Sequence, residues 1–297
     1  MKIGIIGSGF GIYGWLNSFI SLKNIKVCTL SRYKKKIKQY KNKIIYFRSL
    51  KELINNIDTL VIAKRPIDQE KIIKLVLKNK RKKNLILEKP LCKDPESSIK
   101  IFHKILKKKL NFSTGLISKN TNWSEDISIL IKKKKVNHVS IKWFFNAHHY
   151  KNNLVNWKKY YKDGGGSLNF FAIHLIYWIS CFGKFKIQSV SKNKKKNEDP
   201  DIRIKLKNHN LNFDLTCKTN SLNFNYFKII GYKKSKKVFL KKLKNPFDLK
   251  KKIDLDPRTV YLKRQINDIL KNKWENYKNF QRFLNLWKDI YKKHQNI

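Results

Sequence analysis

The stretch KIGIIGSGFGIYGWLNSFI, residues 2–20, decides how the N-terminal part of the chain folds. It opens with a short apolar run rich in β-branched residues, which is typical of a buried strand in a parallel sheet. Glycines follow at once, and apolar residues then recur with helical spacing. A strand, a glycine-rich turn and a helix in this order form the arrangement that holds a dinucleotide pyrophosphate on amides at a helix N-terminus.

Individual roles follow from the spacing of these glycines. We expect Gly7 to make the tight turn and Gly9 to let the backbone approach a phosphate. The strict motif places its third glycine at position 12, where this chain has Ile12, and nearby glycines are the available substitutes. The sequence therefore predicts a cofactor loop made of Gly7, Gly9, Phe10 and Gly11.

The end of the second predicted strand, KVCTL (residues 26–30), indicates which cofactor binds. A fold that binds NAD normally places Asp or Glu about twenty residues after the glycines. No acidic residue precedes Glu52, and the strand ends instead at Ser31 and Arg32. A hydroxyl and a guanidinium bind a 2′-phosphate, whereas a carboxylate repels it. The sequence therefore favours NADP(H), with NAD(H) as the alternative.

Helical and apolar segments then alternate, as SLKELINNI (49–57), DTLVIAK (58–64), IDQEKIIKLVLKNK (67–80) and NLILEKPL (84–91). Ser49 is a plausible cap for the first of these helices. The alternation predicts a doubly wound parallel sheet.

Successive strands with turns between them, from FKIQSVSK to KSKKVFLKK, predict a second, open and mostly antiparallel sheet. The fold class is therefore α/β. We expect a Rossmann NAD(P)-binding domain in residues 1–115 and a C-terminal α+β domain for substrate and oligomerisation in residues 116–297.

The formal net charge of +49 raises the question of a nucleic-acid partner. Lysine supplies most of this charge beside abundant asparagine and isoleucine, which is the residue usage of an AT-rich genome. Arginine, which is preferred for bidentate base and phosphate contacts, is not enriched. We therefore expect no specific nucleic-acid partner. A basic nucleic-acid binder that uses the fold as a scaffold remains a third hypothesis.

Cysteine spacing and hydropathy bear on the compartment. The cysteines lie far apart without a C-x-x-C pair, so we expect neither a metal site nor a disulfide framework. Small buried hydrophobes in a reduced, cytoplasmic setting fit this spacing. They are Cys28, Cys92, Cys181 and Cys217. No apolar run reaches eighteen residues, so no membrane span is expected.

Two motifs resemble the oxidoreductase family of glucose-fructose oxidoreductase and inositol dehydrogenase (Gfo/Idh/MocA). Glu88-Lys89-Pro90 ends the fifth predicted strand, and GGGSLNFFAIH (164–174) is similar to the glycine triplet that the family places before its catalytic histidine. The family joins a Rossmann domain to a domain with an open sheet. It moves a hydride between NAD(P) and a sugar, a cyclitol or a related substrate.

The resemblance implies roles for Lys89 and His174: Lys89 polarises the substrate oxygen, and His174 exchanges its proton, while Glu88 belongs to the cofactor site. The position of Lys89 supports its role, because doubly wound sheets bind ligands at the carboxyl ends of their strands. His174 shares a helix side with aromatic residues, which also suits a buried core histidine. The three preceding glycines permit a close backbone approach to a ligand. Candidate substrate contacts are Tyr160, Tyr161 and Asn169.

Two departures from the family pattern leave a second hypothesis open. Phe170 stands where members that oxidise sugars have an aspartate, and Lys64–Pro66 replace a Thr-Pro-Asn stretch. The main hypothesis is an NAD(P)-dependent oxidoreductase acting on a carbonyl or secondary alcohol of a sugar or sugar-derived small molecule. The alternative is a non-catalytic nucleotide-binding partner or sensor. The resemblance also implies a homo-oligomer, because the outer face of the second sheet commonly packs against another subunit.

Two further segments carry expectations of their own. His148 and His149 lack a metal partner at ligand spacing, so we expect them in a loop lining the cleft. KNKKKNEDPD (192–201) is expected to be a charged loop without chemistry.

Overall fold

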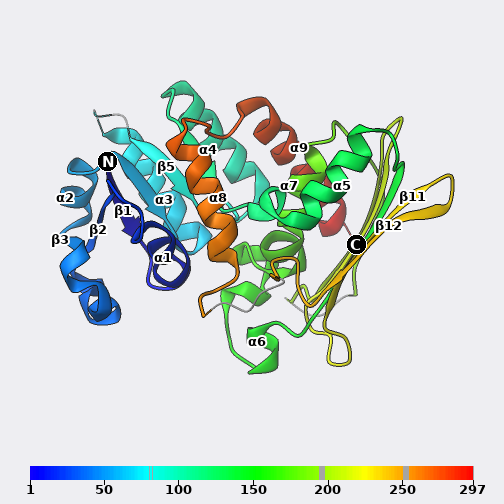
Figure 1. The fold of residues 1–297 in the computed structure, drawn as a ribbon, viewed down its shortest axis with the longest axis horizontal. Helices are drawn as coiled ribbons and strands as arrows, with labels where there is room; N and C mark the ends of the chain where they lie inside the picture. Colours follow the sequence, from blue (N-terminus) through cyan, green and yellow to red (C-terminus); the bar gives the residue numbers. More distant parts are fainter. Residues whose placement is uncertain (80, 82, 194–197, 250–253, 297) are drawn as a thin grey trace. The chain divides into compact units, whose positions relative to one another are not determined.

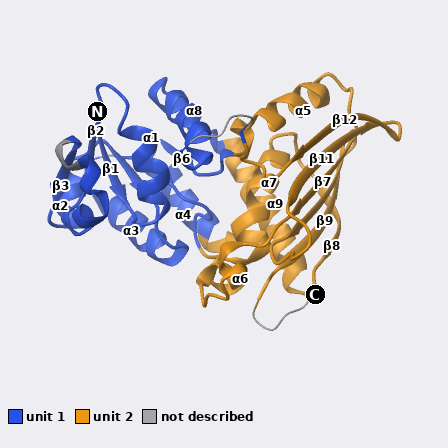
Figure 2. Ribbon diagram, turned by 60° about the horizontal axis from the view of Figure 1, so that its bottom comes forward, with its two compact units in different colours: residues 1–92, 98–117, 249–277 blue, residues 93–97, 118–248, 278–297 orange. Residues whose placement is uncertain are grey.

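The computed structural model describes residues 1–79, 81, 83–193, 198–249 and 254–296. The chain forms two compact units, coloured separately in Figure 2. Unit 1 contains residues 1–92, 98–117 and 249–277, and unit 2 contains residues 93–97, 118–248 and 278–297.

Unit 1 is built on a six-stranded parallel sheet (Figure 1) in the order β3-β2-β1-β4-β5-β6. The strands are β1 (Lys2–Ile6), β2 (Lys26–Leu30), β3 (Ile44–Phe47), β4 (Thr59–Ile62), β5 (Asn84–Leu87) and β6 (Phe112–Thr114). Its main helices are α1 (Asn17–Phe19), α2 (Leu50–Asn55), α3 (Pro66–Lys78) and α8 (Arg258–Leu270), together with α4 (Pro95–Lys107) from residue 98 onward. The central strands β4 and β5 are buried along nearly their whole length. The predicted doubly wound sheet is confirmed.

The start of α2 shows how local sequence sets one of these elements. The Ser49 hydroxyl accepts a hydrogen bond from the Glu52 amide (3.1 Å), and the Glu52 carboxylate accepts one from the Arg48 amide (2.9 Å). The first bond is an N-cap bond that satisfies an amide left over at the helix start, and the second holds the residue before the cap. The predicted cap at Ser49 is confirmed.

Unit 2 contains a second six-stranded sheet in the order β12-β11-β7-β10-β9-β8. The strands are β7 (His138–Phe144), β8 (Lys186–Ser191), β9 (Asp201–Lys207), β10 (Asn212–Lys218), β11 (Tyr226–Lys233) and β12 (Lys236–Leu243). Neighbours are antiparallel except for β7 and β10, which are parallel. The prediction of a mostly antiparallel sheet is confirmed.

One face of this second sheet is covered by helices. Side chains alternate along β7, where Val139, Ile141 and Trp143 are buried and Lys142 is exposed. Figures 1 and 2 both show α5 (Asn122–Lys132), α7 (Ile173–Ser180) and α9 (Tyr277–Gln295) along one face of the sheet. The short α6 (His148–Lys151) follows β7.

The C-terminal region is divided differently from the single domain expected over residues 116–297. Residues 249–277, which contain α8, return to unit 1. The Gln265 side chain donates to the Ser113 hydroxyl and to the Thr114 carbonyl, both at 2.6 Å, and the Glu275 amide donates to Phe112 (2.9 Å). These partners at β6 lie about 150 residues away in the chain and leave no local pattern.

Three cysteines behave as expected and one does not. Cys28, Cys92 and Cys217 are buried, and burial raises the pKa of Cys28 to about 11. Cys181 is exposed, because it follows the last residue of α7. The prediction of burial was therefore wrong for Cys181.

Neither a membrane helix nor a metal cluster was found in the described residues. Within that part of the chain, no helix has the length and apolar character that a bilayer crossing requires. No group of three or more metal-ligating side chains lies together there.

Candidate active site

The glycine-rich turn of unit 1 contains one glycine that the backbone requires and one that faces open space. Gly7 has a φ of +141°, and a Cβ there would lie 2.1 Å from the Ala63 carbonyl oxygen. A Cβ at Gly9 would meet no atom within 4 Å. Gly7 therefore allows β1 and β4 to meet closely, whereas the space above Gly9 is available to a ligand.

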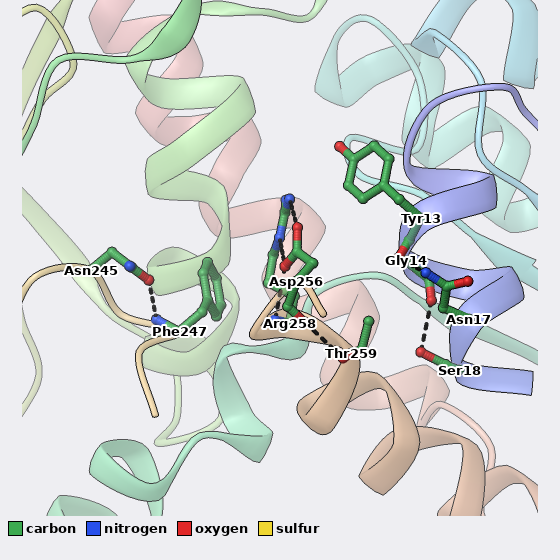
Figure 3. A network of polar contacts seen from close by, with 9 residues as sticks. All are labelled: Tyr13, Gly14, Asn17, Ser18, Asn245, Phe247, Asp256, Arg258 and Thr259. Atoms are coloured by element: carbon green, nitrogen blue, oxygen red, sulfur yellow. Dashed lines mark hydrogen bonds and ion pairs between the residues drawn. The ribbon is translucent and has the colours of Figure 1, made fainter. Parts of the chain in front are cut away.

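The ring of Phe10 packs against the helical segment that follows this turn, at Gly14. The amides of Ile12 and Tyr13 donate to the Gly9 carbonyl (2.8 and 3.3 Å), and a π-helical segment, Gly11–Leu16, runs directly into α1. A Cβ at Gly14 would lie 2.5 Å from the Phe10 ring. Gly14 therefore makes room for Phe10. Figure 3 shows the next turn, where the Ser18 hydroxyl donates to the Gly14 carbonyl (2.8 Å).

Glu88 links the end of β5 to this helix. Its carboxylate accepts a hydrogen bond from the Trp15 indole (2.6 Å), and both side chains are buried. Burial raises the pKa of Glu88, while the charge of Lys89 and the bond from Trp15 oppose that rise. Through this bond to Trp15, Glu88 holds the helical segment that follows the predicted cofactor loop. Lys89 follows at the carboxyl end of the strand and is half-buried.

Gln69, on α3, fixes the backbone of the Glu-Lys-Pro segment and was missed by the sequence analysis. Its side-chain oxygen accepts from the Glu88 amide (2.9 Å), and its nitrogen donates to the carbonyls of Glu88 (2.6 Å) and Leu91 (3.0 Å). Gln69 is completely buried. Its place on the apolar face of a predicted helix was the available signal, since a buried amide needs partners.

Ser31 and Arg32 lie at the carboxyl end of β2, beside the strand that leads into Gly7. Both are exposed. The Ser31 hydroxyl donates to the Phe47 carbonyl (3.1 Å), and the Arg32 guanidinium lies 5.3 Å from the Tyr33 ring centroid. A hydroxyl and an exposed guanidinium at this edge can bind a phosphate ester.

In unit 2, His174 lies on α7 and is 5% exposed. Its ring packs edge-on against Phe247, with centroids 5.2 Å apart, and its carbonyl accepts a hydrogen bond from the Ser118 hydroxyl. In Figure 3 the Phe247 amide donates to Asn245 (2.8 Å), which fixes the turn that carries this ring. The histidine is therefore buried with its ring against an aromatic side chain.

The glycine triplet before α7 is required by the protein itself. A Cβ at Gly165 would lie 2.2 Å from the Trp157 carbonyl oxygen, and one at Gly166 would lie 2.5 Å from the Asp199 carboxylate. Gly164 and Gly166 have φ values of +83° and +80°. The sequence alone suggested that these glycines make room for a nearby ligand. The structure gives them a second cause, the close approach of Asp199 and of neighbouring backbone.

Asp199, in the segment expected to be a charged loop without chemistry, has a structural role that the sequence did not indicate. It is 1% exposed, and its carboxylate contacts the His294 ring (2.9 Å), the Ser167 hydroxyl (3.1 Å) and the Leu168 amide (3.2 Å). It thus ties α9 to the segment that leads into α7. Residues 194–197 lie outside the described residues. No local pattern announced Asp199, because its partner His294 is 95 residues away.

The three candidate substrate residues lie at or beside the segment that runs from the glycine triplet into α7. Asn169 is fully buried; its oxygen accepts from the Trp287 indole (2.9 Å) and its nitrogen donates to the Tyr161 carbonyl (3.2 Å). Tyr160 and Tyr161 are half-buried, and the Tyr160 carbonyl accepts from the Gly165 amide (2.9 Å). Asn169 thus holds the fold of unit 2 with both ends of its side chain.

Phe170 belongs to a cluster of aromatic side chains in unit 2. Its ring lies edge-on to Trp157 (5.3 Å) and Phe171 (4.9 Å), and the Lys158 ammonium lies 5.2 Å from its centroid. An apolar ring with a neighbouring cation replaces the carboxylate that the resemblance led us to look for.

His149, expected in a loop, is buried in α6, and it should make the protein sensitive to acid. Burial, together with the charges of Lys158 and Lys159, lowers the pKa of His149 to about 4. The unfolded chain takes up this proton below pH 6.5, so the stability from neutral His149 is complete above pH 6.5 and is lost as pH falls toward 4. The loss is about 2 kcal/mol at pH 5.

Melting temperatures of wild type and His149→Gln between pH 7.5 and 4 would test this. We expect the wild type to lose more stability than His149→Gln over that range. A His148→Gln variant, which changes an exposed neighbour, should keep the wild-type profile. Parallel curves for wild type and His149→Gln would contradict the prediction.

Comparison with known proteins identifies the family of the N-terminal domain. Residues 1–116 match the GFO_IDH_MocA model, described as the oxidoreductase family with an NAD-binding Rossmann fold. Residues 1–116 therefore have the sequence features of an NAD-binding Rossmann domain of this family. The resemblance is thereby confirmed over the part of the chain that contains the Glu-Lys-Pro segment.

Solved Gfo/Idh/MocA-type structures share the fold over nearly the whole chain. The WlbA dehydrogenase from Bordetella pertussis, in complex with NADH and UDP-GlcNAcA, is 13% identical with a TM-score of 0.78, covering 100% of this chain and 97% of its own. Myo-inositol 2-dehydrogenase from Lactobacillus plantarum is 13% identical with a TM-score of 0.76, covering 99% and 97%.

A putative NADPH-dependent oxidoreductase from Desulfitobacterium hafniense is 14% identical with a TM-score of 0.75, covering 100% and 96%. At these identities the likeness establishes the fold. No curated protein is close enough in sequence to count as a match.

Proposed function

We propose that this chain is an NAD(P)-dependent oxidoreductase that transfers a hydride to or from a carbonyl or secondary alcohol of a sugar or sugar-derived small molecule. The observation that carries the proposal is the open space above Gly9 in a Gfo/Idh/MocA Rossmann domain that also presents Lys89 at the end of β5.

The residues of unit 1 fit a dinucleotide. Gly9 leaves a cradle that a side chain would fill, and Gly7 and Gly11 keep the turn close to β4. A bound nicotinamide would supply the hydride donor or acceptor. The chain's own task in this domain is to seat the pyrophosphate at the glycine-rich turn, with Phe10 beside it.

NADP(H) is the cofactor we propose, with NAD(H) as the alternative. Exposed Ser31 and Arg32 support this choice, and no carboxylate follows β2 within the first 51 residues. Both groups are suited to bind a 2′-phosphate.

The proposed chemistry divides between Lys89 and His174. In the oxidation direction, His174 takes the hydroxyl proton as the C–H bond breaks and its hydride leaves for the nicotinamide; in reduction, it returns that proton to the oxygen. Lys89 donates a hydrogen bond to the same oxygen and stabilises its developing negative charge. Half-buried Tyr160 and Tyr161 are proposed as substrate contacts, and Asn169, whose side chain is engaged at both ends, is left out.

The substrate class is proposed from two supports. WlbA, which shares the fold, is seen in complex with UDP-GlcNAcA, and inositol 2-dehydrogenase, which also shares it, is named for a cyclitol. The Phe170 ring is suited to pack on the apolar face of a sugar, and the neighbouring Lys158 ammonium is suited to an anionic group on the same compound. Nucleotide sugars and sugar acids are therefore the first compounds to try.

A hydride-transfer screen tests the proposal. Purified protein is mixed with NADPH or NADH and a panel of keto sugars, and in reverse with NADP⁺ or NAD⁺ and nucleotide sugars, sugar acids and inositol, while reduced nicotinamide is followed by absorbance. We expect turnover of at least one sugar-derived compound, faster with the phosphorylated cofactor. Tight cofactor binding without turnover on any compound would instead support the sensor alternative, which the phenylalanine at position 170 motivates.

Self-association and a cytoplasmic location remain predictions. On the outer face of the second sheet, Lys142 pairs across strands with Lys228, which pairs with Lys242. Like charges at directly opposed positions repel, so we expect any association through this face to strengthen with salt. Light scattering at low and high salt measures it.

A further inference from the structure

Arg258 brings a cation to a glycine-rich turn that has none of its own. Residues 3–22 contain no lysine or arginine, although the chain carries a net charge of +49. Arg258 begins α8, in the segment that returns to unit 1. Its guanidinium lies 4.3 Å from the centroid of the Phe10 ring and 5.9 Å from that of Tyr13.

Asp256 holds this guanidinium in one orientation. The Arg258 Nε and Nη2 atoms donate to the two Asp256 oxygens at 2.9 and 2.6 Å, as drawn in Figure 3. The Asp256 carbonyl in turn accepts from the Thr259 hydroxyl (2.7 Å). Burial alone would raise the pKa of Asp256, but its bonds to Arg258 outweigh burial and hold that pKa below its usual range.

The arrangement leaves one side of the guanidinium available. The side chain remains one-third exposed, and its Nη1 atom makes no hydrogen bond to any residue in the described ranges. An arginine needs five acceptors to satisfy all its donors, and Asp256 takes only one edge of the fork. The guanidinium lies over the ring of Phe10, the residue between Gly9 and Gly11 in the sequence.

We propose that Arg258 is a cofactor-binding residue that neutralises the pyrophosphate, with Phe10 and Asp256 as its positioning residues. This inference rests on the proposed function, because it assumes that a dinucleotide occupies the turn. A guanidinium is weakly hydrated and matches phosphate oxygens in geometry, so it suits this place better than the lysines that dominate the chain. Only eight of the 69 basic residues are arginine, and one of them lies here.

The test compares two arginines of the same helix. Arg258→Gln and Arg264→Gln each remove one positive charge from α8, but the Arg264 guanidinium lies over Tyr261 rather than Phe10. NADH affinity is measured by nicotinamide fluorescence, and ADP-ribose affinity by competition with NADH. We expect Arg258→Gln to weaken both ligands about 10- to 100-fold, and Arg264→Gln to leave both within about twofold. Arg258→Lys, which keeps the charge but loses the fork, should fall between wild type and Arg258→Gln.

The outcomes separate this inference from the proposed function. Wild-type protein that binds neither NADH nor NADPH would refute the proposed function, whatever the variants do. Wild-type binding with unchanged affinity in Arg258→Gln would overturn the role of Arg258 alone. A loss of NADH affinity without a loss for ADP-ribose would also overturn it, because ADP-ribose retains the pyrophosphate. If Arg258→Gln melts before it can be measured, Arg258→Lys decides by the same criterion.

Discussion

Lys89→Met and His174→Ala are each expected to lower turnover by about 10²- to 10⁴-fold, the range that proton transfer by a positioned group contributes. NADPH and NADH affinity should stay within about twofold of wild type, because neither residue belongs to the glycine-rich turn. Methionine keeps most of the length of the lysine side chain and removes its charge and donors. The measurement is kcat on the substrate found in the hydride-transfer screen, together with cofactor affinity.

Matched control variants test whether the loss of any exposed lysine or histidine would lower turnover. Lys100→Met changes an exposed lysine on α4, and His148→Ala changes an exposed histidine beside β7. Both should keep wild-type turnover. Full activity in Lys89→Met and His174→Ala would refute the catalytic assignment, and His174 would then be a core histidine packed on Phe247.

Gly9→Ala and Gly7→Ala are expected to separate ligand binding from folding. The methyl group at position 9 meets no atom, so we expect unchanged or slightly raised stability without cofactor and a loss of cofactor affinity of at least about tenfold, as the methyl takes the space of a phosphate. The methyl group at position 7 would lie 2.1 Å from the Ala63 oxygen, at a φ of +141°. We expect Gly7→Ala to lose more than about 2 kcal/mol of folding stability.

Thermal melts of the cofactor-free proteins and NADPH titrations measure both effects. Gly9→Ala protein that binds NADPH as tightly as wild type would contradict the placement of the pyrophosphate at this turn. An unchanged melting temperature in Gly7→Ala would contradict the close approach of β1 and β4.

The features that the sequence predicted well are those set by neighbouring residues. The alternation of apolar strands and amphipathic helices, the Ser49 cap and the glycine-rich turn all depend on residues within one or two turns of each other. These patterns were sufficient for the parallel sheet and the second, mostly antiparallel sheet.

The features that the sequence did not predict depend on partners far along the chain. Gln69 reaches backbone groups about twenty residues away, and Asp199 and Gln265 contact partners 95 or more residues away. Periodicity finds a helix but not the element on which it packs. The sequence showed the glycine triplet Gly164–Gly166. It did not show why glycine is needed there, which is the close approach of the Asp199 carboxylate and the Trp157 backbone.

The central claim, that unit 1 holds a nicotinamide dinucleotide at Gly9, is tested most directly by titrating the purified wild-type protein with NADPH and NADH at moderate salt. Nicotinamide fluorescence reports binding in each case. We predict saturable binding of both, with NADPH tighter because Ser31 and Arg32 are the residues proposed to bind its 2′-phosphate. Equal affinities would remove the role of those two residues and leave the site. No binding of either reduced or oxidised cofactor would contradict the claim, and this chain would be a Rossmann fold without its ligand.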